Sequence, residues 1–183
     1  MEKEMGSGDS KETSVDTSMI RRIKKYIISN RISFEEAKQI FKEDLLAKVF
    51  AQKESVPLEV FNHKELGAFE SLVKYLHENL YLDFSEISEI TARSIKTVWA
   101  SYKKASEKHS SQFAIHHETI RIPISIIQNR ELGVQENIVV YLKDEAGMTY
   151  HDIADALERD DRTVWTAYNR AKKKLMKKGQ EEA

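Results

Sequence analysis

Apolar residues recur at helical spacing along the second half of the chain, and this pattern predicts three successive helices. The apolar face of the first helix is formed by Val134, Ile138, Tyr141 and Leu142. The faces of the next two are formed by Tyr150, Ile153, Ala154 and Leu157 and by Val164, Tyr168, Ala171 and Leu175. Gly147 follows the first helix, where a C-terminal cap is expected. Such faces are typical of small amphipathic helices that pack around one core.

Capping residues stand where these helices are expected to begin. Thr149 precedes the second helix with Asp152 three residues on, and Asp160 precedes the third. Asp83, Glu86 and Ser94 stand at the same spacing in the first half of the chain. The two halves thus have different residues at these positions, but all of them are of the capping type. This indicates that helices start at both places. A short helix, a turn and a longer basic helix form the plan of a helix-turn-helix.

The chain contains one sequence unit twice, in an alignment that places Pro57 on Pro123. From Pro57 to Ala105, 15 of 49 positions are identical to their partners in the second copy, without a gap. The identities include Glu65-Leu66-Gly67 with Glu131-Leu132-Gly133, and Thr97-Val98-Trp99 with Thr163-Val164-Trp165. Self-similarity at a fixed offset predicts two copies of one structural unit.

The remaining segments complete the expected organisation, which is all-α with two tandem trihelical helix-turn-helix units. The N-terminal helical hairpin consists of helices over Met19–Asn30 and Phe34–Lys53, the second with Ser33 and Glu36 at capping-box spacing. In order, we expect a disordered leader (1–17), this hairpin (18–54), unit one (56–108), a linker (109–118), unit two (119–178) and a charged tail (179–183).

Two features of these segments leave alternatives open. The basic cluster Arg21–Lys25 is either an arm or, as we expect, a solvated helix face, and the apolar side of its helix (Ile20, Ile23, Ile27) provides a possible homodimer contact. The stretches at 56–61 and 120–127, which precede each first helix, are rich in β-branched residues and contain Pro57 and Pro123. They are either short strands or extended braces, and we expect braces.

Residues 148–175, MTYHDIADALERDDRTVWTAYNRAKKKL, resemble region four of bacterial sigma factors and related response-regulator output domains. They share the aromatic-x-x-Ile-Ala start, the turn before a Thr-Val pair and the basic Arg-Ala-Lys-Lys-Lys-Leu ending. Residues 85–105, SEISEITARSIKTVWASYKKA, show the resemblance more weakly. The resemblance implies that the third helix enters the major groove of DNA while the second crosses the backbone.

The resemblance also implies which side chains face the groove. In unit two they are Asp161, Arg162, Trp165, Thr166, Asn169 and Lys173, and in unit one Ile95, Lys96, Trp99, Ala100, Lys103 and Glu107. Arg162 and Lys96 are suited to guanine edges and Asn169 to an adenine. Phosphate contacts are expected from Arg170, Lys172 and Lys104. Ile95 and Ala100 make unit one the less specific reader.

The charge distribution supports this interpretation although the net charge is only −1. Residues 161–178 carry seven basic side chains and one acidic, and residues 93–108 carry five and one. The second helices are acidic instead. Taken alone, the basic run 172–178 favours a solvated helix end that complements the helix dipole. Two basic third helices within one motif favour phosphate contacts, and hence duplex DNA.

Trp99 and Trp165 each follow a core valine, about 100° further around the helix. They lie either at the DNA or partner surface or half-buried, capping their own bundle or packing one unit against the other. We expect the packed arrangement, with a tandem interface as its most attractive form.

Composition excludes several classes of protein. Cysteine is absent, so neither disulfides nor thiolate metal sites can form, and no stretch approaches the roughly 20 apolar residues of a membrane span. The N-terminus lacks a signal-peptide pattern, which favours a soluble cytoplasmic protein. His63, His77, His109, His116, His117 and His151 lack metal-ligand spacing on one helix face. We find no catalytic motif and expect neither an enzyme nor a cofactor or metal site.

The sequence therefore predicts a DNA-binding transcription regulator. The alternative is a protein-interaction or scaffold module, in which the third helices dock onto RNA polymerase or another transcription protein. The first would depend on Arg162 and Lys173, with steep salt dependence, and the second on Trp99 and Trp165.

Overall fold

The computed structural model describes residues 31–40, 55–115 and 120–181, together with the helical positions 23, 25 and 27. Most of the expected N-terminal hairpin and the leader lie outside these residues. Within the hairpin, α2 (Phe34–Ile40) begins with the expected capping box, because Ser33 Oγ accepts from Glu36 N–H and the Glu36 carboxylate accepts from Ser33 N–H. No helix in the described part of the chain is both long and apolar enough to cross a membrane.

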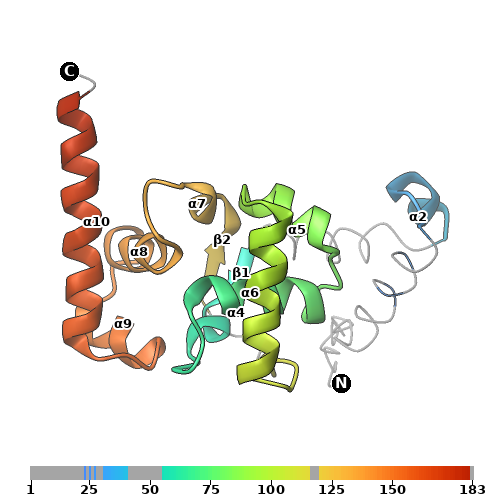
Figure 1. Ribbon diagram of the computed structural model, residues 1–183, viewed down its shortest axis with the longest axis horizontal. Helices are drawn as coiled ribbons and strands as arrows, with labels where there is room; N and C mark the ends of the chain where they lie inside the picture. The colour runs from blue at the N-terminus through green and yellow to red at the C-terminus, as the bar shows by residue number, and fades with distance from the viewer. Residues whose placement is uncertain are drawn as a thin grey trace, which may run out of the picture.

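The chain is mostly helical, as expected, and its elements recur in the same order in its two halves (Figure 1). The first half contains β1 (Ser55–Pro57), the 3-10 helix η1 (Leu58–Phe61), α4 (Ala68–Lys74), the π-helical turn η2 (Tyr75–Asn79), α5 (Phe84–Thr91) and α6 (Ile95–Lys108). The second half contains β2 (Arg121–Pro123), α7 (Ile124–Gln128), α8 (Val134–Val140), the π-helical turn η3 (Tyr141–Glu145), α9 (Tyr150–Ala156) and α10 (Asp161–Glu181). α10 thus continues past residue 178, where unit two was expected to end.

The expected helix caps are present, which explains why the helices begin where they do. Thr149 and Asp152 form a reciprocal capping box at α9. Asp83 and Glu86 do the same at α5, and Ser94 Oγ accepts from Thr97 N–H at α6. After η3, Gly147 has a φ of +69°, the left-handed conformation that glycine adopts without strain.

The expectation of braces before each first helix is wrong, because these stretches begin with two short strands that pair with each other. β1 and β2 are antiparallel, with Val56 opposite Ile122 and both side chains fully buried. Ser55 lies opposite Pro123 and Pro57 opposite Arg121. Since Pro57 and Pro123 are equivalent positions of the repeat, exchanging the strands leaves the pairing unchanged. The strand pairing therefore has local twofold symmetry. In Figure 1, α6 and α10 run in opposite directions.

One hydrophobic core joins the two halves. Buried residues of the first half, among them Leu72 and Leu76, form a single cluster with Ile138 and Leu142 of the second. α4 packs on α8 and α5 on α7, so the halves also contact each other outside the strand pair. The two halves are consequently held in one body, and Phe113, in the segment expected to be a linker, is itself buried.

Arg159, in the turn between α9 and α10, links the halves by hydrogen bonds. Its Nη2 donates to the carbonyl oxygens of His63 and Leu66, both at 3.0 Å. Arg93 holds the equivalent position in the first half. There the guanidinium lies 5.9 Å from the ring of Phe69, and its Nη1 reaches only the carbonyl of Thr91, at 3.5 Å.

We expect Arg159→Ala to lower the free energy of unfolding by about 2–3 kcal/mol, because it leaves two carbonyl groups without their charged donor. Arg93→Ala is the matched control and should cost about 0.5–1 kcal/mol, the range of an exposed cation–π contact. Urea denaturation monitored by circular dichroism measures both values. Equal losses would contradict the larger contribution expected from the bonds between the halves.

Candidate nucleic-acid interface

The segment from α9 to α10 has the geometry of a helix-turn-helix. α9 ends at Ala156, and Glu158 takes a left-handed φ of 48° in the turn. The backbone N–H groups of Thr163 and Val164 then donate to the carbonyl of Asp160, which starts α10. Asp160 thus stands at the expected boundary and accepts both bonds with its backbone oxygen.

The outer face of α10 carries the side chains that were expected to read DNA. Val164, Ala167 and Ala171 are buried against α8 and α9. The opposite face presents Arg162, Trp165, Thr166, Asn169 and Lys173, which are exposed or half-exposed. Since these positions follow the i, i+3, i+4, i+7 and i+11 spacing, they form one continuous stripe along the helix.

Several basic residues of α10 are not available to a ligand, because they form ion pairs with acidic side chains of the second half. Lys172 Nζ lies 2.7 Å from Asp144 Oδ2, and Lys174 Nζ lies 2.7 Å from Glu136 Oε2. The bond from Lys172 lowers the pKa of the Asp144 carboxyl. Lys178 pairs with Glu131. The expected phosphate contact Lys172 therefore lies on the flank of the outer face, already in an ion pair.

Three basic side chains of α10 remain without a hydrogen bond or ion pair to the described residues, namely Arg162, Arg170 and Lys173. Arg162 and Arg170 line a shallow groove of about 410 Å³ with Thr166 and with Glu136 of α8. Two guanidinium groups along one open groove, neither in a hydrogen bond or ion pair with the described residues, suit an external anion such as a phosphate, although the nearby Glu136 carboxylate offsets part of their charge.

α6 repeats this arrangement with different side chains. Val98 and Ala105 are buried against α4 and α5, and Lys96, Trp99 and Lys103 lie on the outer face. Lys103 Nζ lies 5.7 Å from the centroid of the Trp99 ring. The other outward positions hold Ile95, Ala100, Lys104 and Glu107. Compared with α10, the stripe is more apolar and offers fewer hydrogen-bonding groups.

The expectation that Trp99 and Trp165 are packed is wrong. Trp99 is 51% exposed and Trp165 is 55% exposed. The reason is that Val98 and Val164 point straight into the core, and the next residue is turned away from α4 or α8. The core that the two halves share is built instead from the strand pair and from α4 and α8, so neither indole lies between the halves.

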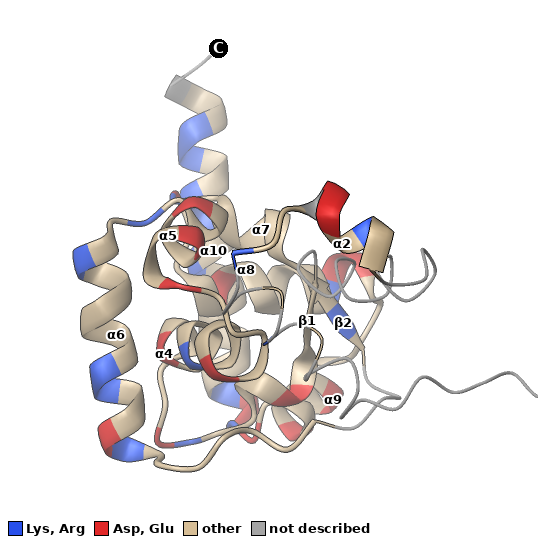
Figure 2. Cartoon of the chain, turned by 90° about the vertical axis from the view of Figure 1, so that its right-hand side faces the viewer, with Lys and Arg blue, Asp and Glu red and all other residues tan. Residues whose placement is uncertain are grey.

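Acidic side chains gather on α5 and α9, the second helices of the two halves. The third helices, α6 and α10, are mainly basic (Figure 2). At the junction of α9 and α10, His151 lies 3.6 Å from Asp155 and 3.4 Å from Asp161. The hydrogen bond to Asp161 and the charge of Asp155 raise the pKa of His151. A charged imidazole at this place reduces the negative potential beside the first turn of α10.

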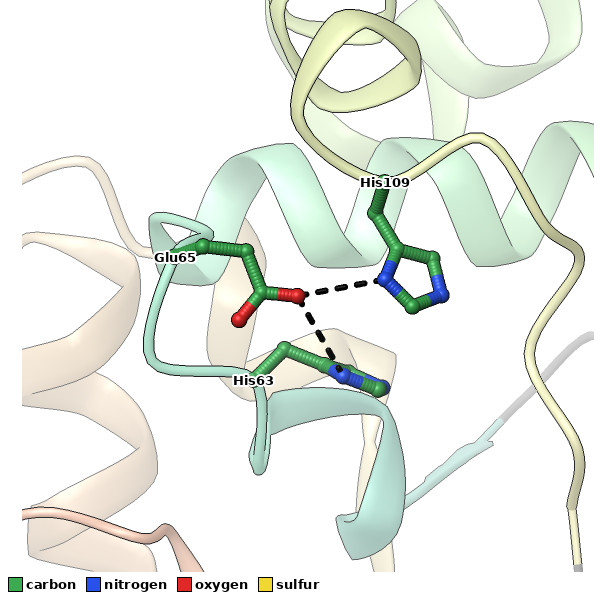
Figure 3. A group of neighbouring side chains, drawn as sticks. All are labelled: His63, Glu65 and His109. Carbon is green, nitrogen blue, oxygen red and sulfur yellow. Dashed lines mark hydrogen bonds and ion pairs between the residues drawn. The ribbon is translucent and has the colours of Figure 1, made fainter.

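A second group of polar side chains was missed by sequence reasoning. His63, Glu65 and His109 lie together between the loop before α4 and the end of α6 (Figure 3). His109 Nδ1 is 3.1 Å from Glu65 Oε1, and His63 Nδ1 is 3.8 Å from the same oxygen. Burial, and then the neighbouring His109, lower the pKa of His63. No spacing on one helix could reveal this group, since the third residue lies 44 positions after the second.

In the comparison with protein families, residues 130–175 fit the family described as Sigma-70, region 4. The match spans α8, α9 and most of α10. No curated protein and no solved structure is significantly similar to the chain. Region 4 is a DNA-binding module of transcription rather than a catalytic one, and it interacts with RNA polymerase. Residues 130–175 therefore form a sigma-70 region-4-like helix-turn-helix.

Proposed function

We propose that the protein is a sequence-specific duplex DNA-binding regulator of transcription that places α10 in the major groove. The observation that carries this proposal is the outer stripe of α10, where Arg162, Asn169 and Lys173 face away from the core within the segment that fits region 4. In helix-turn-helix proteins, the N-terminal part of this helix contacts base edges. α9 would then cross the phosphate backbone.

The chemistry of the side chains assigns their roles. Arg162 can donate two parallel hydrogen bonds to a guanine, and Asn169 can pair with an adenine. Asn169 Nδ2 now donates to the carbonyl of Trp165, and Thr166 Oγ1 donates to that of Arg162, so both are held close to the helix until a base competes. Arg170, which has no ion-pair partner among the described residues, is the first candidate for a phosphate.

α6 would act as a second, less specific reader, which makes the chain a tandem of two helix-turn-helix units. Lys96 corresponds to Arg162, and Lys103 and Lys104 correspond to Asn169 and Arg170. Their side chains supply charge but little base discrimination. Because the strand register has local twofold symmetry, two engaged units would meet inverted half-sites, as in helix-turn-helix dimers.

The decisive test follows the fluorescence of Trp99 and Trp165 while mixed-sequence duplex DNA is titrated at about 50 and 200 mM salt. Both indoles lie on the outer faces of the third helices, so binding there should change their emission. We expect binding that weakens by orders of magnitude over this range, since each neutralised phosphate contributes a slope of about −0.9 in log K against log salt. Anisotropy of labelled duplex is the independent signal.

Selection from a random duplex pool would then be expected to recover inverted half-sites, one better defined than the other. Failure of both signals at low salt would overturn the DNA proposal.

A second function is favoured by one observation on α6. Ile95 and Trp99 are both 51% exposed and lie one helical turn apart, which gives this helix an outward apolar pair that α10 lacks. Such a pair suits a protein partner, for example RNA polymerase or another transcription protein. Binding of such a partner should depend on Trp99 and vary little with salt. Contact between two copies through the N-terminal helices is a further proposal, but Ile23 and Ile27 of the expected contact face are already buried within one chain.

A further inference from the structure

We propose that His63, Glu65 and His109 form a binding site for one Zn²⁺ ion. The three side chains come from the loop between η1 and α4 and from the residue that follows α6, and they converge on one point (Figure 3). This site is separate from the outer faces of α6 and α10 and does not depend on DNA binding.

The distances suit a metal centre with three protein ligands. The donor atoms all lie within 4.8 Å of one another, and Glu65 Oε1 is 3.1 Å from His109 Nδ1 and 3.8 Å from His63 Nδ1. Zinc bonds of about 2.0–2.2 Å in a tetrahedron place the donor atoms roughly 3.3 Å apart. Small side-chain rotations would therefore complete the geometry, with water as the fourth ligand.

The backbone of both histidines is held by hydrogen bonds. The backbone N–H of His109 donates to the carbonyl of Ala105 at 2.8 Å, and the carbonyl of His63 accepts from the backbone N–H of Leu66 at 3.1 Å. The ring of Phe113 stacks on His63 with the centroids 4.5 Å apart. Ser111 Oγ lies 3.1 Å from His109 Nε2, where it can accept a hydrogen bond from the Nε2–H group and so favour the tautomer in which Nδ1 is free to bind metal.

Two imidazoles with one carboxylate suit Zn²⁺ better than Mg²⁺ or Ca²⁺, because these two cations prefer oxygen ligands alone. The repeat provides an internal comparison. The positions equivalent to His63, Glu65 and His109 are Asn129, Glu131 and Leu175. The second half therefore has the carboxylate but neither imidazole. We expect the chain to bind one ion at this kind of site, not two.

A bound ion would fix the end of α6 to the loop that leads into α4. It would also act across the two halves, because the carbonyl of His63 accepts a hydrogen bond from Arg159 in the helix-turn-helix that fits region 4. We therefore assign the site a stabilising role at the junction of the halves.

The test is a calorimetric titration of Zn²⁺ into chelator-treated full-length chain, with Co²⁺ absorption as a second readout of tetrahedral coordination. We expect one ion per chain. At a free Zn²⁺ concentration about 100 times Kd, the Tm should rise by about 5–10 °C. His63→Asn and His109→Leu introduce the residues found in the second half, so both variants should fold. Each should weaken binding at least about tenfold, since even outer contacts of a metal site contribute that much.

The matched control is His151→Gln, because His151 is exposed and lies beside Asp155 and Asp161, outside this group, and it should keep wild-type affinity. Loss of binding in this control would overturn the assigned ligand set. The proposal would also fail if His63→Asn and His109→Leu bound zinc as tightly as the wild type. Absence of saturable Zn²⁺ binding at micromolar concentrations would overturn it equally.

Discussion

Arg162→Ala should weaken binding of the preferred duplex by about 1–3 kcal/mol, or roughly 5- to 150-fold, which is the range for losing a bidentate contact with a base. Arg162 lies in the first turn of α10 on its outer face, and no hydrogen bond or ion pair with the described residues holds it. The loss should be much smaller on mixed-sequence DNA, because only one positive charge disappears there. Anisotropy titrations with the two duplexes at one salt concentration measure the difference.

Lys96→Ala, at the equivalent position of α6, is the matched control. Lys96 is also exposed and at the start of its helix, but its neighbours Ile95 and Ala100 offer no further base readout. We therefore expect a smaller loss of specific affinity than for Arg162→Ala. Equal losses would contradict the ranking of the two units, and no loss from Arg162→Ala would contradict the assignment of α10 as the reading helix.

The helices and their caps could be predicted from the sequence because the interactions that define them are local. Thr149 and Asp152 are three residues apart and form their capping box within one turn of backbone. The apolar faces were equally readable, and Ile138, Ile153 and Val164 are all buried as their spacing predicts. The family match to residues 130–175 agrees with the resemblance stated for residues 148–175.

The structural features that the sequence did not predict depend on contacts between distant segments of the chain. The strand pair joins Val56 to Ile122, and the proposed metal ligands His63 and His109 meet only after α6 returns to the loop before α4. Lys74 is a further example, since it is fully buried and its ammonium bonds to Glu78 at 2.7 Å. Its counterpart in the second half is Val140, so the repeat gave no hint of a buried charge.

The exposure of the tryptophans also depends on tertiary structure. A position beside a core valine can lie at a helix interface or in solvent, and only the packing of the first helices decides between them. Here the halves meet through the strand pair and the α4–α8 contact, which leaves both indoles outside. The same arrangement makes them suitable reporters of ligand binding.

Ile122→Ala should lower the free energy of unfolding by about 2–5 kcal/mol, because it removes a fully buried side chain at the strand pair that joins the halves. Ile120→Ala is the control, since Ile120 is the same residue type two positions earlier and is 41% exposed. It should change stability by less than about 0.5 kcal/mol. Urea denaturation followed by circular dichroism measures both.

The shape of the unfolding curve tests how the halves are coupled. Because one buried cluster contains residues of both halves, we expect a single transition whose midpoint falls in Ile122→Ala while its slope m stays unchanged. Leu76→Ala and Leu142→Ala, which empty equivalent and fully buried positions of the two halves, should shift that same transition. Two separate transitions, each sensitive to only one of these variants, would show that the halves fold independently. In that case, the local symmetry at β1 and β2 would not fix how α6 and α10 are placed together on one duplex.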